Sequence, residues 1–407
     1  MRVVLVVESF PKPSETFFVT RFRHLLERGW DMHVVCRSDD GADWSFFPEL
    51  MRISGVTDRV RRRPATSPRW WALALLPVVV ARTFVGQPRA TLRYVMRGWR
   101  RFGLRVLVRL YHDAPIVRLR PDVVHVTFGS LAKGAEHLGA LLDCAFLVSF
   151  QGADVNYAGL DEEPGYYADV WTNASGLHFQ GQDLLRRAQR RGFAPDGREC
   201  VILPGVDAHA FAPSERRGQH DGSLRILSVG RLHWKKGYEY ALDAVARLRD
   251  RGVACRYRVI GGGELYDALL FARDDLGLND VVELLGPLPP SQVVEQMRWA
   301  DVLLHAATSE GFCYAVVEAQ AMELPVVTSD ADGLGENVAD SKTGFVVPRR
   351  DPEALTAALA KLAADAHLCH RMGAAGRQRV LARFGVDREI DEWEKFYRRA
   401  AAGSEQG

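Results

Sequence analysis

Short runs of apolar residues recur along the whole chain, and they constrain its fold more than any other feature. The runs VVLVV, MHVVC, DVVHVTF and AFLVSF lie in the first 200 residues, and LRILSVG, YRVIGGG, VVELLG, DVLLHA and LPVVTS follow after residue 223. Segments with helical spacing, such as 240–251 and 292–299, separate them. Short, fully apolar strands between helices are typical of a parallel sheet that helices cover on both faces. The sequence therefore predicts an α/β protein in which one Rossmann-like architecture occurs twice.

The length of the chain also favours two domains. At 407 residues and 47% hydrophobic content the chain can bury two cores, because single domains usually contain about 100 to 200 residues. Residues 204–224 are rich in Gly, Pro, Ser and charge, which is the profile of a linker. We therefore predict an N-terminal domain at 1–203, a hinge at 204–224, a C-terminal domain at 225–386 and a terminal helix at 387–407.

Cysteine usage and hydropathy indicate a cytoplasmic protein. The six cysteines are scattered singly with no CxxC pair, which favours free thiols in a reducing compartment. The N-terminus has the pattern of a buried strand without a leader cleavage site. The longest apolar stretch, 70–81, has 12 residues, whereas a membrane-spanning helix needs about 20. We expect no transmembrane segment.

Two glutamates, Glu310 and Glu318, lie eight residues apart in the run TSEGFCYAVVEAQAMELPVV. An apolar strand at 302–305 precedes them, so Glu310 is expected in a loop and Glu318 one to two turns into the next helix. Open α/β sheets bind ligands at such strand-to-helix junctions. Both carboxylates can then face one cleft, although a solvated loop acid beside an exposed helix acid would give the same spacing.

A second junction carries positive charge. The strand predicted at 224–229 ends in Gly230 and Arg231, and Lys236 follows before the next helix. A guanidinium fork and an ammonium point charge together suit a diphosphate, and Lys235 is expected to be a solvated neighbour. The helix after Gly311 adds free amide groups where anions bind. No acidic pair at a strand end and no histidine cluster is visible, so we expect no metal.

These two segments resemble a known family. Residues 310–318 resemble the Glu-x7-Glu element of retaining family 4 glycosyltransferases of the GT-B fold, and 230–237 match its Gly-Arg-Leu-x-x-x-Lys-Gly motif at every fixed position. The resemblance is continuous over about 224–362. In the N-terminal half it is thinner, although residues 9–17 look like the loop of a subgroup that builds bacterial exopolysaccharides.

The resemblance implies two Rossmann-like domains facing across a cleft, with a nucleotide diphosphate sugar as co-substrate and no other cofactor. It assigns Glu310 to the donor sugar hydroxyls, Glu318 to the ribose, and Arg231 and Lys236 to the donor phosphates. Glu310, Arg231 and Lys236 are thereby the predicted catalytic residues. The remaining predicted donor-binding residues are Gly230, Gly311, Phe312 and Gly263.

The N-terminal half supplies three residues that we predict to bind acceptor or sugar. Gln151 stands where many relatives carry a histidine, and glutamine cannot act as a general base. Asp154 can orient hydroxyls of sugar or acceptor, or it can cap the next turn. Glu15 can contact a ligand, or it can favour the start of a helix that Ser14 caps.

The predicted function is a retaining, metal-independent hexosyltransferase that moves a sugar from a nucleotide diphosphate sugar to a glycan or lipid-linked acceptor. One alternative keeps the fold but makes a small soluble glycoside or natural product. Another is a non-catalytic protein that binds nucleotide sugars or nucleic acid. The presence of both glutamates together with Arg231 and Lys236 disfavours it, and we expect no nucleic-acid partner.

Residues 59–112 hold thirteen arginines and no acidic residue, interleaved with seven aromatic residues. The aromatic and aliphatic spacing, as in 92–110, suits an interfacial helix on an anionic membrane surface, which would make the protein peripheral at the inner face of the membrane. Alternatively, this basic face packs on its own core.

Overall fold

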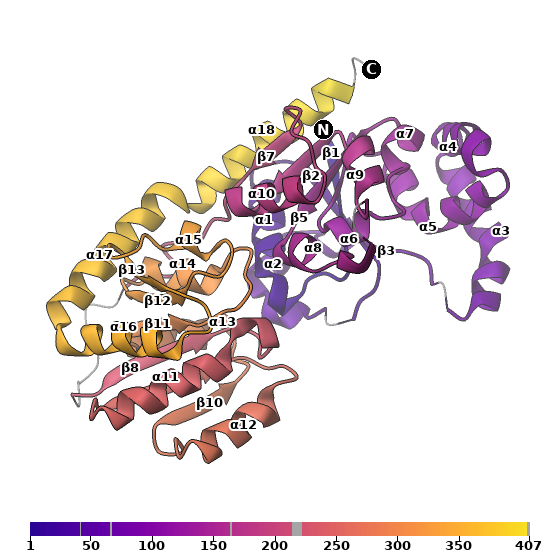
Figure 1. Ribbon diagram of the computed structural model, residues 1–407. Helices are drawn as coiled ribbons and strands as arrows, with labels where there is room; N and C mark the ends of the chain where they lie inside the picture. Colours follow the sequence, from indigo (N-terminus) through magenta and orange to yellow (C-terminus); the bar gives the residue numbers. More distant parts are fainter. Residues whose placement is uncertain (41, 66, 163–164, 214–221, 405–407) are drawn as a thin grey trace. The chain divides into compact units, whose positions relative to one another are not determined.

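The computed structural model describes residues 1–40, 42–65, 67–162, 165–213 and 222–404, which form two compact units (Figure 1). The first unit comprises Met1–Phe179, Arg186–Ile202 and Ile390–Gly407, and the second comprises Gln180–Leu185 and Leu203–Glu389. The chain therefore passes between the units more than once. Part of the predicted hinge, 214–221, lies outside the described residues.

The first unit is built on a parallel sheet of seven strands in the order β3-β2-β1-β4-β5-β6-β7. Its strands are β1 (Arg2–Val7), β2 (Asp31–Cys36), β3 (Val60–Arg62), β4 (Val123–Val126), β5 (Ala145–Phe150), β6 (Gly176–Phe179) and β7 (Glu199–Val201). All residues of β4, β5 and β6 are buried, as expected of central strands covered on both faces.

Eleven α-helices connect or cover these strands in the described part of the first unit, and the last two of them begin in the second unit. They are α1 (Thr16–Glu27), α2 (Pro48–Met51), α3 (Arg69–Gly86), α4 (Pro88–Phe102), α5 (Arg105–Leu119), α6 (Gly129–Ala132), α7 (Leu138–Leu142), α8 (Gly152–Asn156), α9 (Ala168–Asn173), α10 (Gln182–Arg190) and α18 (Val386–Ser404). Short 3-10 turns lie at η1 (Pro13–Glu15), η2 (Trp44–Phe46), η3 (Thr57–Arg59) and η4 (Leu160–Glu162).

The terminal helix α18 completes the core of the first unit. One apolar face of this helix is buried, with Trp393 and Tyr397 fully enclosed. The Tyr397 hydroxyl lies 2.9 Å from Nδ1 of His125 on β4, and the guanidinium of Arg21 on α1 stacks 3.7 Å above Trp393. The last helix is therefore held by ring packing and by a buried polar contact to the sheet.

The second unit is built on a parallel sheet of six strands in the order β10-β9-β8-β11-β12-β13. Its strands are β8 (Leu224–Val229), β9 (Cys255–Ile260), β10 (Val282–Gly286), β11 (Val302–His305), β12 (Val326–Ser329) and β13 (Gly344–Val347). The helices are α11 (Tyr238–Asp250), α12 (Tyr266–Asp275), α13 (Pro290–Trp299), α14 (Tyr314–Ala321), α15 (Leu334–Asn337), α16 (Pro352–Ala364) and α17 (Ala366–Arg383), with a 3-10 turn η5 (Trp234–Lys236).

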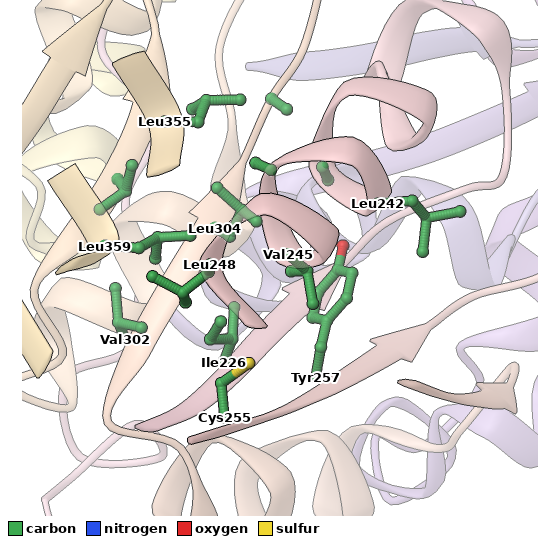
Figure 2. Close-up of a cluster of buried hydrophobic side chains, with 14 of the residues drawn as sticks. Ile226, Leu242, Val245, Leu248, Cys255, Tyr257, Val302, Leu304, Leu355 and Leu359 are labelled. Atoms are coloured by element: carbon green, nitrogen blue, oxygen red, sulfur yellow. The ribbon is translucent and has the colours of Figure 1, made fainter. Parts of the chain in front are cut away.

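Two apolar layers enclose the second sheet. On one face α11 and α16 pack on the strands, and Figure 2 shows Leu248 of α11 and Leu359 of α16 beside Val302 of β11. On the other face α13 and α14 cover the strands through side chains such as Met297 and Val316, both fully buried. These layers fix the strand ends that carry the predicted donor residues.

Several predictions from the sequence can be compared directly with these elements. All six cysteines are free thiols, as predicted. In the described part of the chain, no helix combines the length and the apolar character needed to cross a membrane.

Two helix predictions were wrong. The stretch 92–110 is two helices, because Gly103 takes a positive φ of 52° and ends α4 before α5 begins. Helix α1 begins at Thr16 after the 3-10 turn η1, so its N-cap position is Glu15 instead of Ser14.

Candidate active site

The predicted donor residues meet at one edge of the second sheet, where the direction of its winding changes. Strand β8 comes first in the sheet; the chain then adds β9 and β10 on one side of β8 and β11 to β13 on the other. In doubly wound sheets, ligands bind at the carboxyl ends of the two strands at this switch point. The loop after β8 carries Arg231 and Lys236, and the loop after β11 carries Glu310.

Lys236 and Glu310 form a buried ion pair between these two loops. Lys236 Nζ donates a hydrogen bond to Glu310 Oε2, and the two side chains are only 13% and 9% exposed. Burial by itself would raise the pKa of Glu310, but the neighbouring Lys236 and His305 hold it well below its usual range. Burial would likewise lower the pKa of Lys236, but Glu310 raises it. Both groups are therefore charged at neutral pH.

His305 and Cys313 belong to the same cluster, and the sequence did not single them out. His305, the last residue of β11, places Nε2 3.5 Å from Glu310 Oε2 and Nδ1 3.9 Å from Cys313 Sγ. Burial raises the pKa of the Cys313 thiol, but His305 and Lys236 outweigh it and lower that pKa. The position of His305 at the end of a buried strand was the only available signal.

The same cluster is the one group in the described residues whose side chains could hold a metal ion. The ligand atoms of His305, Glu310 and Cys313 all lie within 4.8 Å of one another. However, the ammonium of Lys236 is hydrogen-bonded to Glu310 and would repel a cation placed there. The donor set therefore suits an ion-paired polar cluster better than a metal centre.

Asp332 holds the Glu310 loop in place, and it too was missed. Its Oδ2 accepts hydrogen bonds from Ser309 Oγ at 2.7 Å and from the amide of Glu310 at 3.0 Å. Its Oδ1 accepts one from Arg349 at 3.1 Å. These contacts join residues 17 to 23 positions apart in the sequence, so only the folded chain reveals them.

Glu318 lies in the second turn of α14, as predicted, and its environment differs from that of Glu310. Its side chain is half-buried, and burial raises the pKa of its carboxyl to about 7. Within the described residues nothing donates a hydrogen bond to this carboxyl group. Glu318 thus keeps its full capacity to accept hydrogen bonds from a ligand.

Arg231 is also available to a ligand. It is exposed, and no described residue forms a hydrogen bond or an ion pair with its guanidinium. Lys235, by contrast, is half-buried, so it is less solvated than predicted, and burial lowers its pKa.

Glycines let the backbone segments around this edge approach one another closely. A Cβ on Gly237 would lie 2.1 Å from the carbonyl oxygen of Ala306, and one on Gly263 would lie 2.3 Å from that of Leu232. Gly230 is less crowded, because its nearest neighbour would be the Tyr238 hydroxyl at 3.3 Å. Gly263 therefore lets the loop after β9 pass close to the backbone of Leu232.

The other predicted donor residues lie at the start of α14. Gly311 is buried, and the ring of Phe312 packs edge-on against Tyr314 and Phe384 in an apolar cluster. Only the backbone of Phe312 is left for a ligand. The amide of Cys313 already donates to Asn337 Oδ1 at 3.1 Å, so an anion would use the amides that follow it.

The predicted acceptor residues belong to the first unit and follow strands of its sheet. Gln151 and Asp154 form a capping box at α8, and Asp154 accepts hydrogen bonds from the amides of Gln151 and Ser130, each at 2.9 Å. Gln151 also donates to the carbonyl of Thr127 at 3.3 Å. Of the two roles considered for Asp154, the structure shows the capping one. Glu15 forms an ion pair with Lys12 at 3.3 Å.

Comparison with known proteins gives this geometry a family. The family model for glycosyl transferases group 1 matches residues 213–379. WcaL of Escherichia coli (strain K12), named as a colanic acid biosynthesis glycosyltransferase, is 36% identical over 387 residues, covering 88% of this chain and 90% of WcaL. The chain belongs to the group 1 glycosyltransferases. The amylovoran biosynthesis glycosyltransferase AmsK of Erwinia amylovora is 28% identical over 390 residues, 89% of this chain and 90% of AmsK.

Solved structures of other proteins share the fold. Sucrose-phosphate synthase from Thermosynechococcus elongatus superimposes with a TM-score of 0.76 at 19% identity, over 99% of this chain and 100% of that one. HepE from Anabaena, solved in complex with UDP-glucose, gives a TM-score of 0.72 at 15% identity, over 97% and 98% of the two chains. The glycosyltransferase therefore has the GT-B fold with two Rossmann-like sheets, as the sequence predicted.

Proposed function

We propose that this glycosyltransferase transfers a hexose from a nucleotide diphosphate sugar, with retention of anomeric configuration and without a metal ion. Arg231 and Lys236 bind the donor diphosphate, Glu310 the hydroxyls of the donor sugar, and Glu318 the ribose of the nucleotide. The acceptor is a glycan or a lipid-linked sugar of exopolysaccharide synthesis, because WcaL and AmsK are named for colanic acid and amylovoran biosynthesis.

The observation that carries the proposal is the distribution of partners at the switch point of the second sheet. Arg231 has no hydrogen bond or ion pair in the described residues, and the carboxyl of Glu318 receives none. Lys236 and Glu310, in contrast, form an ion pair with each other that keeps both side chains charged. A nucleotide diphosphate sugar supplies an anion for Arg231 and Lys236, sugar hydroxyls for Glu310 and ribose hydroxyls for Glu318.

The transfer needs no protein base in this proposal. The bond between the anomeric carbon and the diphosphate oxygen breaks, the acceptor oxygen bonds to that carbon on the same face, and the departing diphosphate oxygen takes the acceptor proton. Arg231 and Lys236 stabilise the charge that develops on the diphosphate, so catalysis is mostly positioning and electrostatics. Lys236 supports this role, since Glu310 raises its pKa and keeps it protonated.

The test begins with the nucleotide. Thermal shifts with UDP, GDP and ADP identify the base, since a nucleotide at 100 times its Kd adds about 2.7 kcal/mol to the stability. UDP comes first because the HepE structure holds UDP-glucose. The matching sugar donor is then supplied in excess EDTA, and the anomeric configuration of the product is read by NMR. An inverted product, or no turnover without added magnesium, would overturn the retaining or the metal-independent part of the proposal.

We place this reaction in the cytoplasm, with the enzyme peripheral at the inner face of the membrane when its acceptor is lipid-linked. The six free cysteines support a reducing compartment. Fractionation of cells that express the full-length protein tests the placement, and recovery from an oxidising compartment would contradict it.

A further inference from the structure

The helices α3, α4 and α5 of the first unit present a large apolar surface for which the donor site gives no explanation. More than half of the exposed large apolar side chains in the described residues lie between positions 70 and 108. Figure 1 shows α3 and α4 at the outer edge of this unit, and they pack on α5 and α7 instead of on the strands.

One face of α3 is apolar and uncovered along its whole length. Successive residues of a helix turn by about 100°, which places 70, 73, 77, 81 and 84 on one side, flanked by 74, 78 and 85. The most exposed of these are Val85 at 81%, Leu73 at 70% and Trp70 at 66%. Arg82 is the one charged residue between Trp70 and Val85. Val80 of α3, which is partly buried, packs on the apolar cluster formed by α4 and α5.

The platform beneath α3 is firmly built, so the exposed face is a fixed feature of the fold. Buried Asp113 on α5 accepts a hydrogen bond from the Tyr94 hydroxyl of α4 at 2.7 Å and contacts His137 Nε2 at 2.8 Å. Thr91 of α4 donates to the carbonyl of Thr83 in α3 at 3.1 Å. Gly98 lets α4 approach α5, because a Cβ there would lie 2.5 Å from Val106.

Positive charge accompanies this face, and part of it has no acidic partner. The stretch 59–112 holds thirteen arginines and no acidic residue. Arg93 and Arg97 pair with Asp143. In contrast, four exposed arginines have no ion-pair partner within the described part of the chain: Arg82, Arg89, Arg100 and Arg105.

We propose that α3 lies in the interface of an anionic lipid bilayer, with its apolar face among the acyl chains and the arginines of α4 and α5 at the lipid phosphates. The helix is 18 residues long, or about 27 Å. If it lies parallel to the membrane surface, its exposed apolar face is buried along the whole length of the helix. Trp70 and Trp71 are the residue type enriched at membrane interfaces. The inference is independent of the donor chemistry proposed above.

Charge distinguishes this occupant from a second copy of the chain. A symmetric dimer places the same patch on both subunits, so the unpaired arginines around α3 would face each other. Like charges at such an interface are unfavourable, whereas anionic headgroups complement them. A nucleic acid fits poorly, because the exposed face of α3 offers almost no hydrogen-bond donors to phosphates.

The test is flotation of the full-length protein with vesicles of phosphatidylcholine alone or of an equimolar mixture with phosphatidylglycerol. Wild-type protein is expected to float with the anionic vesicles and to lose part of this binding at high salt, where screening acts within about 10 Å or less. The double substitution Leu73→Asp and Val85→Asp should lower the vesicle partition coefficient more than about tenfold, because it removes two apolar anchors and adds negative charge.

A matched control comes from the second unit. Phe271 on α12 is 73% exposed and lies outside this surface, so Phe271→Asp should float like wild type. The proposal is overturned if wild-type protein stays at the bottom with anionic vesicles at low salt, or if the double variant floats as well as the control. A wild-type homodimer that the double substitution dissociates, with no flotation, would overturn it in favour of a second copy.

A second measurement does not depend on acidic substitutions. Brominated acyl chains quench tryptophan fluorescence only at close range, so anionic vesicles that carry them should quench the wild-type emission. The conservative variant Trp70→Phe with Trp71→Phe should float but lose most of that quenching. Equal fractional quenching in both proteins would show that another part of the chain meets the lipid and would overturn the assignment to α3.

Discussion

The two units of this glycosyltransferase build sheets with the same winding but treat the polar residues at the carboxyl edge in opposite ways. In the first unit the carboxylate of Asp154 is occupied by the amides of Gln151 and Ser130. In the second unit Glu318 and Arg231 have no such partners among the described residues. At the carboxyl edge of the first sheet, Asp154 uses its hydrogen-bonding capacity to hold loops. At the carboxyl edge of the second sheet, Glu318 and Arg231 have that capacity unused by the described residues.

Lys236 and Glu310 lie at the carboxyl edge of the second sheet but are intermediate between these two cases, because each has the other as its partner. Substitutions along this series should therefore separate stability from activity. Substitution of a side chain that only holds a loop should lower stability. Substitution of a side chain that has no partner in the protein should weaken ligand binding instead.

The largest effect is expected for Lys236→Ala, which leaves Glu310 buried without its partner. Loss of one member of a buried ion pair costs about 3 to 5 kcal/mol of unfolding free energy, and loss of the diphosphate contact should lower kcat/KM at least about 100-fold. Urea denaturation and steady-state kinetics measure the two effects. The double variant Lys236→Met with Glu310→Gln should recover most of the stability and none of the activity, and Lys342→Ala, at an exposed position, is the control.

Glu318→Gln is expected to stabilise the ligand-free enzyme at alkaline pH. The pKa of Glu318 is raised to about 7 in the folded protein, so the folded state binds more protons than the unfolded state between pH 4.5 and 7. Wild-type stability should therefore fall as pH rises through this window, by about 3 kcal/mol for this group, and the difference between wild type and the glutamine variant should appear above pH 7. Thermal unfolding from pH 5 to 8 measures it.

The same substitution should weaken binding of the nucleotide. In the proposed function the carboxylate form of Glu318 accepts hydrogen bonds from the ribose hydroxyls. Wild-type affinity for the nucleoside diphosphate should therefore rise as pH increases through about 7, and the glutamine variant should lose that dependence. Calorimetric titration at several pH values checks this. A variant that is neither more stable at pH 8 nor weaker in binding would show that Glu318 is a solvated acid.

Asp154→Ala should have the reverse profile, a loss of stability without a loss of donor binding. Its carboxylate satisfies two backbone amides, and removal of such a cap costs about 1 to 3 kcal/mol. Chemical denaturation and nucleotide titration together test it, with exposed Asp169→Ala as the control. A large loss of donor affinity at unchanged stability would break the contrast between the two units.

The smallest effect on stability is expected for Arg231→Gln, within about 0.5 kcal/mol, since the side chain is exposed. Its effect on the nucleoside diphosphate should be large, about tenfold to 150-fold in Kd, because a charge-assisted hydrogen bond contributes about 1.5 to 3 kcal/mol. Titration calorimetry measures it. Arg298→Gln, at another exposed position of the second unit, should leave Kd unchanged.

The sequence by itself located most of the strands, although it did not predict β3, β6, β7 or β13, and it placed the motif residues on their loops and helices. The strands predicted at 224–229 and 302–305 coincide with β8 and β11, because short apolar runs bounded by glycine and charge leave little choice of element. The loop position of Glu310 and the helical position of Glu318 follow from the same local pattern. The family also follows, because its motifs are local.

Only the tertiary structure decided which groups meet and which remain without partners. His305, Cys313 and Asp332 lie up to 27 residues apart, and no local pattern shows that they surround Glu310. The same limit applies to the second contact of Asp154, because the amide of Ser130 that it accepts from lies 24 residues earlier in the sequence. The limit applies also to α3, because the sequence pattern of an apolar helix is the same whether its apolar face is covered or exposed. Periodicity reports on neighbours along the chain, whereas burial and pairing depend on contacts that form when distant segments pack together.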